Sequence, residues 1–228
     1  MRKCFLTVLM ITMLFGCAQN GAAKINIEKR EYETDTAAVS IQVPVFSGMR
    51  GSDFQGQINT ELENEINACL ERFTAEIEQE TITGSEKNTF QITQEVTYNK
   101  NNFVSLISEC CIFTGGAHGT TDRMPRNIDI QQERILKLAD LFLDEGYKEK
   151  LTGEINRIME EKPEEYSDLW EKPMLGAAQE DYFYIRDGNL VIFYPPYELS
   201  YYARGFVEFV IPIKALSGYI KPEYMALA

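Results

Sequence analysis

The residue best suited to acid–base chemistry in this chain is its single histidine, His118. An imidazole can act as a general base or bind a metal, and a carboxylate such as Glu198 could orient it. The alternative is an imidazole that hydrogen-bonds its own loop, beside Gly115 and Gly116, which adopt backbone angles that other residues resist. One histidine excludes sites that need two, and no nucleophile elbow, phosphate loop or dinucleotide fingerprint is present. We favour the structural role and predict no catalytic residue, metal or cofactor.

Cysteine is the other residue type here that could form a covalent link, and five are present. Neighbouring side chains on a strand point to opposite faces, so only one of Cys110 and Cys111 could face a helix that carries Cys69. Two interpretations stay open. Either Cys69 forms a disulfide with Cys110 or Cys111 and one thiol is left over, or all three are small buried apolar side chains. No cysteine spacing resembles a zinc site.

The segment that ends at Cys17 is typical of an exported bacterial lipoprotein. Arg2 and Lys3 give it a positive start, and the apolar stretch 5–15 is too short to remain in a bilayer as a spanning helix. It closes with Leu-Phe-Gly-Cys, which resembles a lipobox. We therefore expect a signal peptide over residues 1–16 and a lipid on the Cys17 thiol. An ordinary cleaved signal or a short N-terminal anchor is the alternative.

These features predict a protein held outside the cytoplasm in a bacterial cell envelope, on the outer membrane if the organism is Gram-negative. Residues 17–24 would be the lipidated cysteine and a short tether of small polar residues. Two or more acyl chains on one residue anchor a protein stably, whereas a single chain gives marginal binding. The membrane would thus be a partner through the lipid anchor.

The chain is strongly acidic, with 22 Lys and Arg against 35 Asp and Glu, a net charge of −13. Removing the two cations of the signal gives 20 − 35 = −15 for the mature chain. Such a surface repels nucleic acid and attracts cationic partners. We therefore expect no nucleic-acid partner, and the charge permits a basic protein ligand without requiring one.

A run of tyrosines near the C-terminal third could anchor a ligand. Tyr197, Tyr201 and Tyr202 stand close together in the sequence, around Glu198. If exposed, they would suit a protein or a sugar, because tyrosine offers a large contact area at low entropic cost. If they pack beneath the proline-containing loop, they are part of the core. We favour packing for most of them, because a group of aromatic residues is not by itself a site.

Hydrophobic periodicity predicts an α+β fold of mostly antiparallel sheets, packed by one long N-terminal amphipathic helix and a second, shorter helix. Apolar residues recur at every third or fourth position over residues 54–80 and again over 147–161. Strand patterns alternate over the following ranges: 25–33, 38–46, 90–98, 103–113, 126–130, 133–138, 182–185, 190–194 and 206–211.

Some local signals are less regular. Pro44 indicates that its strand lies at a sheet edge or that the strand ends there. Residues 83–85 should end the long helix, and residues 163–170 look like a short helix. The order of the elements divides the mature chain into an N-terminal sub-region, 25–120, and a C-terminal one, 121–228.

Two segments together resemble one known family. Residues 113–118 read Phe-Thr-Gly-Gly-Ala-His, and residues 193–205 read Phe-Tyr-Pro-Pro-Tyr-Glu-Leu-Ser-Tyr-Tyr-Ala-Arg-Gly, with Ile-Pro-Ile-Lys-Ala-Leu at 211–216. In this order and at this spacing they resemble the extracellular domain of the RsiV-type anti-sigma factors. The same domain precedes the catalytic domain of some peptidoglycan deacetylases and occurs alone in envelope lipoproteins. The similarity covers residues 25–216, with 121–228 as the RsiV-like part.

The resemblance implies a compact α+β domain that binds lysozyme in the anti-sigma factors, with no established catalysis of its own. Three functions follow for this chain: a non-catalytic binding domain for an envelope component or a basic protein such as lysozyme, a cell-wall-active hydrolase using His118 and Glu198, or a structural envelope lipoprotein. We favour the binding domain, because one histidine without a surrounding constellation is a poor basis for catalysis. Its candidate binding residues are His118, Gly115, Gly116, Tyr197, Glu198, Tyr201 and Tyr202.

Overall fold

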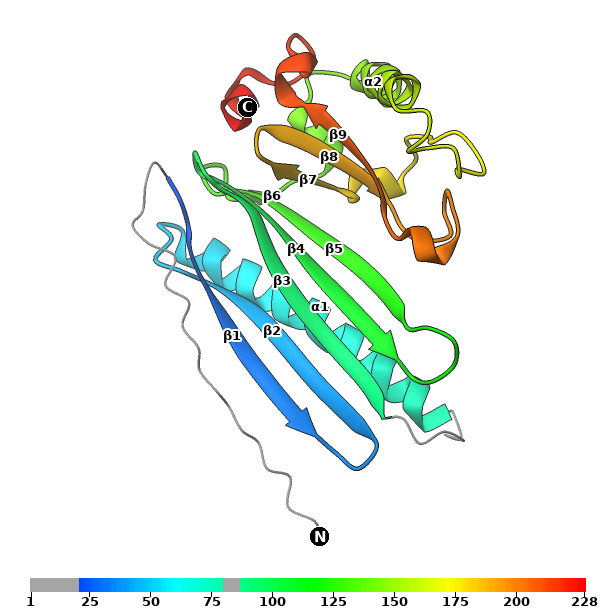
Figure 1. The fold of residues 1–228 in the computed structure, drawn as a ribbon. Helices are drawn as coiled ribbons and strands as arrows, with labels where there is room; N and C mark the ends of the chain where they lie inside the picture. The colour runs from blue at the N-terminus through cyan, green and yellow to red at the C-terminus, as the bar shows by residue number, and fades with distance from the viewer. Residues whose placement is uncertain (1–20, 80–86) are drawn as a thin grey trace. The chain divides into compact units, whose positions relative to one another are not determined.

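The computed structural model describes residues 21–79 and 87–228 (Figure 1). Six of the described strands form one sheet in the order β1-β2-β3-β4-β5-β6, and three form a second sheet in the order β7-β8-β9. The strands are β1 (Lys24–Glu33), β2 (Ala37–Ser47), β3 (Asn88–Lys100), β4 (Phe103–Phe113), β5 (Thr120–Asp129), β6 (Arg134–Ile135), β7 (Phe183–Arg186), β8 (Asn189–Tyr194) and β9 (Val207–Pro212).

Two α-helices are present in the described part of the chain, α1 (Ser52–Gln79) and α2 (Tyr147–Glu161). Short 3₁₀ helices cover five further segments: Leu138–Leu141, Ala178–Glu180, Tyr202–Arg204, Ile213–Leu216 and Pro222–Leu227. Within residues 21–79 and 87–228, none of the helices combines the length and the apolar character that crossing a membrane requires. The predicted α+β fold, with one long and one shorter helix, is confirmed.

Most of the strand pairing is antiparallel, as predicted. β1 with β2, β5 with β6, and both pairs of the three-stranded sheet run antiparallel, whereas β2 and β3 run parallel. A parallel pair needs a long connection, and α1 lies between β2 and β3 in the chain. A tight turn joins β3 to β4, with Asn101 and Asn102 at φ 55° and 56°. Asparagine tolerates this left-handed region better than most residues.

The chain divides into two compact units by its contacts. Of the described residues, the first unit holds 21–79, 87–95 and 107–124, and the second holds 96–106 together with 125–228. Strands β3, β4 and β5 therefore contribute residues to both units. The boundary that we placed between residues 120 and 121 stays a prediction.

In the first unit, α1 lies along one face of the sheet (Figure 1). Its inward stripe recurs at three and four residues and is almost fully buried, namely Phe54, Ile58, Leu62, Ile66, Cys69 and Phe73. Asn59 ties the helix to the end of β2, because its side-chain amide accepts from Phe46 N at 2.8 Å and donates to Phe46 O at 2.9 Å. The residues expected to end α1, 83–85, lie outside the described part of the chain.

In the second unit, the three-stranded sheet is part of a larger apolar core. Tyr166 stacks on Phe209 of β9 with ring centroids 5.1 Å apart, and Tyr194 meets the same ring edge-on at 5.9 Å. A buried polar pair also lies here. Ser105 donates to Asn127 at 2.7 Å, and Asn127 donates to the carbonyl of Phe183 at 2.8 Å. Both side chains are satisfied, so their burial carries no unpaired polar group.

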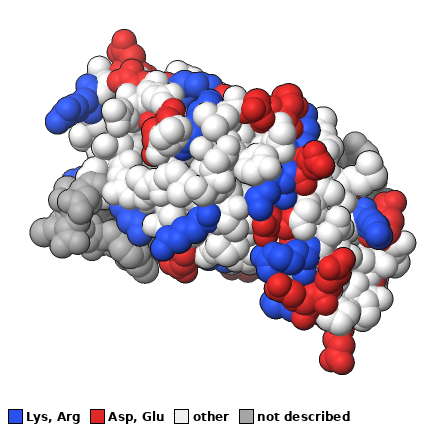
Figure 2. All heavy atoms as spheres, turned by 90° about the horizontal axis from the view of Figure 1, so that it is seen from above, with Lys and Arg blue, Asp and Glu red and all other residues white. Residues whose placement is uncertain are grey.

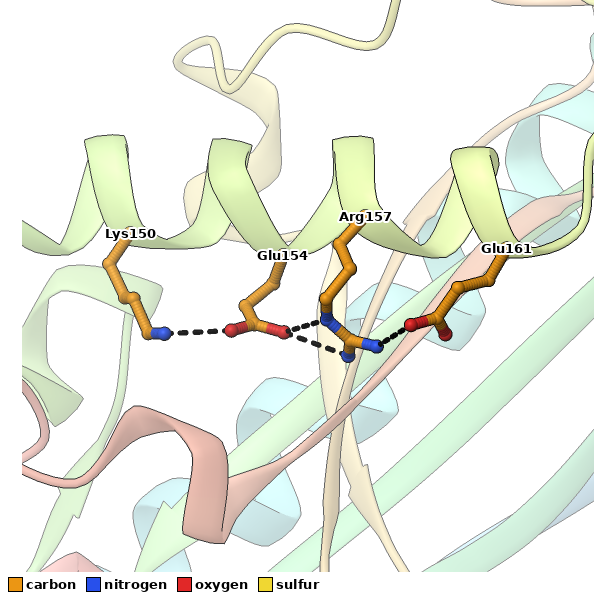
Figure 3. Close-up of polar contacts among 4 residues, drawn as sticks. All are labelled: Lys150, Glu154, Arg157 and Glu161. Carbon is orange, nitrogen blue, oxygen red and sulfur yellow. Dashed lines mark hydrogen bonds and ion pairs between the residues drawn. The ribbon is translucent and has the colours of Figure 1, made fainter.

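Helix α2 has a row of alternating charges on one side (Figure 3). Glu154 accepts from Lys150 Nζ at 2.7 Å and from Arg157 Nε and Nη2 at 3.0 and 2.9 Å, and Arg157 also donates to Glu161 at 2.6 Å. The hydrogen bonds from Lys150 and Arg157 lower the pKa of Glu154, although its burial opposes this. Because these charges pair with one another along the helix, we assign them a role in stabilising α2.

Two of the local predictions are wrong. Pro44 lies in β2, which has β1 on one side and β3 on the other, so it is not in an edge strand. Pro44 is opposite Ile27 of β1, and the parallel pairing with β3 runs only from Ala37 to Ile41. The proline, which has no N–H to donate, thus lies beyond the paired segment of β2 and β3.

Residues 163–168 form turns instead of the predicted helix. The Tyr166 hydroxyl donates to Glu208 O at 3.1 Å, and the Trp170 N–H donates to Leu199 O at 2.9 Å. These contacts with β9 and with the loop after β8 set the path of the segment, so tertiary packing overrides the local helical preference. The strand predicted over 133–138 is shorter than expected, since β6 comprises only Arg134–Ile135, which pairs with Ile128 and Asp129 of β5.

Candidate binding surface

His118 lies in the loop between β4 and β5, and its side chain is exposed. Its Nδ1 lies 2.8 Å from Gly119 O, and because a carbonyl only accepts, this nitrogen donates. Gly115 and Gly116 have φ values of 112° and 88°, which glycine adopts without strain. Gly115 and Gly116 thus have the backbone angles expected for a structural role, and the imidazole has a partner in its own loop; whether this loop also binds a ligand stays a prediction.

Sequence reasoning missed one glycine of this loop. A Cβ built on Gly119 would lie 2.4 Å from the backbone oxygen of Ile112, so no other residue fits without moving the backbone of β4. The only signal in the sequence is that Gly119 directly follows His118. The close approach of two backbones cannot be read from residue types alone.

Glu198 lies in the loop after β8, within the second unit, whereas His118 belongs to the first. Its Oε1 accepts a hydrogen bond from Gln179 Nε2 at 3.0 Å, and Gln179 is itself buried. Partial burial raises the pKa of Glu198, and the hydrogen bond from Gln179 opposes that rise. Each of the two residues proposed for acid–base chemistry thus has a local hydrogen-bond partner, and the pair is not established as one site.

The loop that contains Glu198 is held from beneath by two buried residues. Leu199 belongs to the apolar core, and its carbonyl accepts from Trp170 N. Ser200, which is 2 % exposed, donates to Asp168 O at 3.0 Å. Tyr197 N–H donates to Ser200 O at 3.1 Å. The backbone of the loop is therefore fastened to the segment around residues 168–170.

Tyrosine and tryptophan side chains point outward from this fastened backbone. Trp170, Met174, Tyr197 and Tyr201 are 61 %, 78 %, 58 % and 48 % exposed, and the half-buried Tyr202 packs against Tyr197 with ring centroids 5.6 Å apart. Tyr194, in contrast, is buried, and its hydroxyl donates to Met174 O at 3.1 Å. We call the set Trp170, Met174, Tyr197, Tyr201 and Tyr202 the aromatic surface. The packing that we favoured for most of the tyrosines is therefore not observed for Tyr197 and Tyr201.

Tyr197 has an unusual backbone. Its φ is 70°, in the left-handed region where a bulky side chain is strained. Non-glycine residues in such conformations cost on the order of 1–3 kcal/mol and concentrate at ligand-binding positions. Strain together with exposure of the ring singles out Tyr197 within the aromatic surface.

On the face that Figure 2 shows, charges of both signs are interspersed and do not form one large field of a single sign. Beside the aromatic surface, Arg204 lies 3.4 Å from Asp168 Oδ2 and donates to Glu165 O at 2.9 Å. The acidic residues that follow α2, Glu164 and Glu165, are exposed, as is Glu171 next to Trp170. The surroundings of the aromatic surface thus include several exposed carboxylates.

The cysteines and the possible metal ligands are considered next. Cys17 and the signal segment lie outside the described residues, so the lipid anchor stays a prediction. Cys69, Cys110 and Cys111 are free thiols in the structure. Over residues 21–79 and 87–228, no group of three His, Cys, Asp or Glu side chains is arranged to hold a metal ion.

Comparison with known proteins supports the resemblance seen in the two motifs. Residues 30–121 match a family model described as deacetylase PdaC, and residues 139–214 match one described as a protein of unknown function, DUF3298. The chain is also 26 % identical over 210 residues to the anti-sigma-V factor RsiV of Bacillus subtilis, which covers 86 % of this chain and 70 % of that factor. The resemblance to the RsiV-type proteins is confirmed.

Two solved structures share the fold of this chain. A DUF3298 family member from Bacteroides fragilis matches with a TM-score of 0.63 and 19 % identity, over 91 % of this chain and 97 % of that one. A DUF3298 family protein from Pseudomonas aeruginosa matches with a TM-score of 0.55 and 18 % identity, over 90 % and 96 %. At such identities the RsiV-like chain shares the fold of these proteins, and the fold alone assigns no activity.

Proposed function

We propose that this RsiV-like chain is a non-catalytic binding domain outside the cytoplasm, and that its aromatic surface recognises a basic protein of the lysozyme class. The observation that carries the proposal is Tyr197, a strained residue whose exposed ring is presented by a loop fastened at Ser200. Tyrosine and tryptophan dominate the energetics of protein interfaces, so such a ring suits the centre of a contact.

Preorganisation strengthens this proposal. A binding loop that is already ordered loses less conformational entropy when the partner arrives. Here the buried Ser200 and Leu199 hold the loop, while Tyr197 and Tyr201 stay accessible. Rigid support beneath exposed aromatic rings is the arrangement expected of a recognition surface.

Charge favours a basic partner. The chain carries −13, and the exposed carboxylates of Glu164, Glu165 and Glu171 lie within six positions of Trp170 in the sequence. Complementary charge mainly raises the association rate, and the effect weakens with salt. Lysozyme is basic, so electrostatic attraction would add to the contact made by the aromatic surface.

The location that we propose follows from the N-terminal segment. Cleavage before Cys17 and lipidation of its thiol would hold the domain at a membrane face through the 17–24 tether, in the cell envelope. Metabolic labelling with a lipid precursor, comparing the chain with Cys17→Ala, tests the anchor. Label on the parent chain and none on Cys17→Ala is expected, and label on both would contradict it.

The function itself is tested by calorimetric titration of the purified chain, kept in detergent with its N-terminal segment, against a c-type lysozyme. We expect a dissociation constant of micromolar or tighter at physiological salt. Heat that disappears as salt rises from low to physiological concentration would mean charge attraction alone, and the lysozyme proposal would be wrong. A ligand would then have to be sought among envelope components.

The decisive variant is Tyr197→Gly. Glycine accepts φ 70° without strain, so the backbone is preserved or relaxed while the ring is removed. We expect binding to weaken about tenfold or more, roughly 1.4 kcal/mol, with an unfolding temperature that is unchanged or higher because the strain is relieved. Leu143→Ala is the matched control, because Leu143 is 55 % exposed and lies outside the aromatic surface. Equal affinity of both variants would exclude Tyr197 from the contact.

A further inference from the structure

Two cysteines that are 41 positions apart meet inside the first unit. Cys69 lies on the buried stripe of α1, and Cys110 lies on β4, and each thiol shifts the pKa of the other. Both belong to the same apolar cluster, with Cys69 7 % and Cys110 1 % exposed. A helix and a strand therefore bring these two cysteines, with Arg72 beside Cys110, into one place in the core.

The surroundings of the pair are not purely apolar. Arg72, one helical turn after Cys69, lies with Nη2 4.0 Å from Cys110 Sγ and forms an ion pair with Asp122 of β5. Met124 Sδ lies 3.8 Å from Cys69 Sγ on its other side. A guanidinium beside a thiol pair favours the thiolate, which is the reactive form of cysteine.

The third described cysteine is placed differently. Cys111 is half-buried, and its sulfur accepts from the hydroxyl of Thr121 at 3.6 Å. Because it follows Cys110 directly in β4, its side chain is on the opposite face of the sheet from the one that α1 covers. Of the two partners for Cys69 that the sequence left open, the geometry therefore favours Cys110 over Cys111.

We propose that Cys69 and Cys110 are an oxidation site of this protein, which closes to a disulfide while Cys111 remains a thiol. The oxidant is a second disulfide, either that of a thiol–disulfide exchange protein or a low-molecular-weight one. This proposal is independent of lysozyme binding. The bond would link α1 covalently to the sheet that it covers.

The reaction is thiol–disulfide exchange in two steps. The Cys69 thiolate attacks one sulfur of the oxidant, forming a mixed disulfide and releasing the first thiolate of the oxidant. The Cys110 thiolate then attacks Cys69 Sγ, forming the Cys69–Cys110 bond and releasing the second thiolate. The two protons lost by the cysteines are taken up by the released thiolates, and the oxidant gains the two electrons that the pair loses.

The order of the two steps follows from exposure and charge. Cys69 is the more exposed of the two residues. The neighbouring Cys110 thiol and the charge of Arg72 lower the pKa of Cys69, whereas the Cys69 thiol and burial raise the pKa of Cys110. Cys69 is therefore the attacking thiol and Cys110 the resolving one. Local opening of α1 or the folding reaction itself would admit the oxidant to a nearly buried pair.

Peptide mapping of the full chain tests the proposal. The purified protein is equilibrated with oxidised glutathione, its remaining thiols are alkylated, and trypsin is applied without reduction. Cleavage places Cys69 in the peptide 51–72 and places Cys110 and Cys111 together in the peptide 101–123. We expect these two peptides to appear as one linked species that reduced glutathione abolishes. A folded wild-type chain that gives no linked species would overturn the proposal.

Serine variants assign the bond, because one peptide contains both neighbouring cysteines. Cys111→Ser should keep the linked species, and Cys110→Ser should lose it. A link that persists in Cys110→Ser, or a bond between Cys110 and Cys111, would contradict the assignment. Thermal unfolding gives a second test of the bond. It uses variants that keep Cys110, so it does not depend on whether Cys110→Ser folds. In Cys111→Ser, oxidation should raise the unfolding temperature by roughly 10 °C, and in the Cys69→Ala variant of that chain it should not.

Discussion

The loop that contains His118 and the loop that contains Tyr197 carry the two motifs of the same family resemblance. The interactions that shape the two loops are, however, of opposite kinds. In the first, glycines and a close backbone approach at Gly119 shape the chain, and the exposed imidazole donates back to its own loop. In the second, buried side chains hold the backbone from below, and the aromatic rings point outward. A motif residue can therefore serve to shape the backbone of its loop, or it can present a side chain at the surface. The contacts in the structure, and not the motif, tell these two roles apart.

The largest effect is expected where the second loop is fastened. Leu199→Ala removes a side chain that is 3 % exposed in the core of the second unit. We expect a loss of about 3 kcal/mol in the free energy of unfolding, from lost burial and the cavity left behind. Denaturant titration measures it. Lysozyme binding at a temperature where the variant is still folded should also weaken, since Tyr197 loses its support. A loss below about 1 kcal/mol would mean that Leu199 does not hold the loop.

A somewhat smaller loss is expected in the first loop, through backbone geometry alone. Gly119→Ala brings a methyl group to 2.4 Å from Ile112 O, so β4 or the loop has to move. We expect a destabilisation of about 2 kcal/mol, typical of an overpacked site, again measured by denaturant titration. His118→Ala in the same loop is the control. If Gly119→Ala were as stable as the parent chain, the backbones would not be in close contact in solution.

A pH effect should appear at Glu198 in the second loop. Burial raises the folded pKa of this carboxyl, so the folded state holds its proton to higher pH than the unfolded state. The unfolded state then binds fewer protons between the two pKa values, and stability falls as pH rises through that window. We expect Glu198→Gln to lose this contribution to the pH dependence. Unfolding temperatures at a series of pH values from about 4 to 7 compare the two chains, and identical profiles would contradict the pKa shift.

The smallest effect is expected for His118→Ala. The imidazole is exposed and its mapped hydrogen bond is to the neighbouring Gly119, so we expect a change within about 0.5 kcal/mol in stability and no change in lysozyme affinity. Thermal unfolding and the calorimetric titration check both. If His118→Ala lost much of its lysozyme affinity while its stability stayed normal, the first loop and not the second would be the binding surface.

Elements with a strong internal period could be predicted from the sequence. The long helix at α1, the shorter α2, and strands such as β1 and β4 have bounds close to those expected, because hydrophobic periodicity directly reflects which face is buried. The turn at Asn101 and Asn102 was predictable for the same kind of local reason.

Features that depend on distant contacts could not be predicted. The C-terminal tail has no periodic pattern, yet Tyr224 is buried and its hydroxyl donates to Asp129 Oδ2 at 3.1 Å. The segment that begins at Pro163 was expected to be helical, and the stacking of Tyr166 on Phe209 gives it another path. For the candidate surface, the sequence named Tyr197 and Tyr201 but not their exposure, and Met174 had no signal at all.

Because β3 and β4 contribute residues to both units, neither unit is encoded by one continuous stretch of the gene. Residues 96–106 belong to the second unit but lie in the chain between two stretches of the first, 21–95 and 107–124. A single break in the gene, even between residues 120 and 121, therefore leaves at least one unit without part of a strand. Exchange of gene segments can move this domain intact only as a whole.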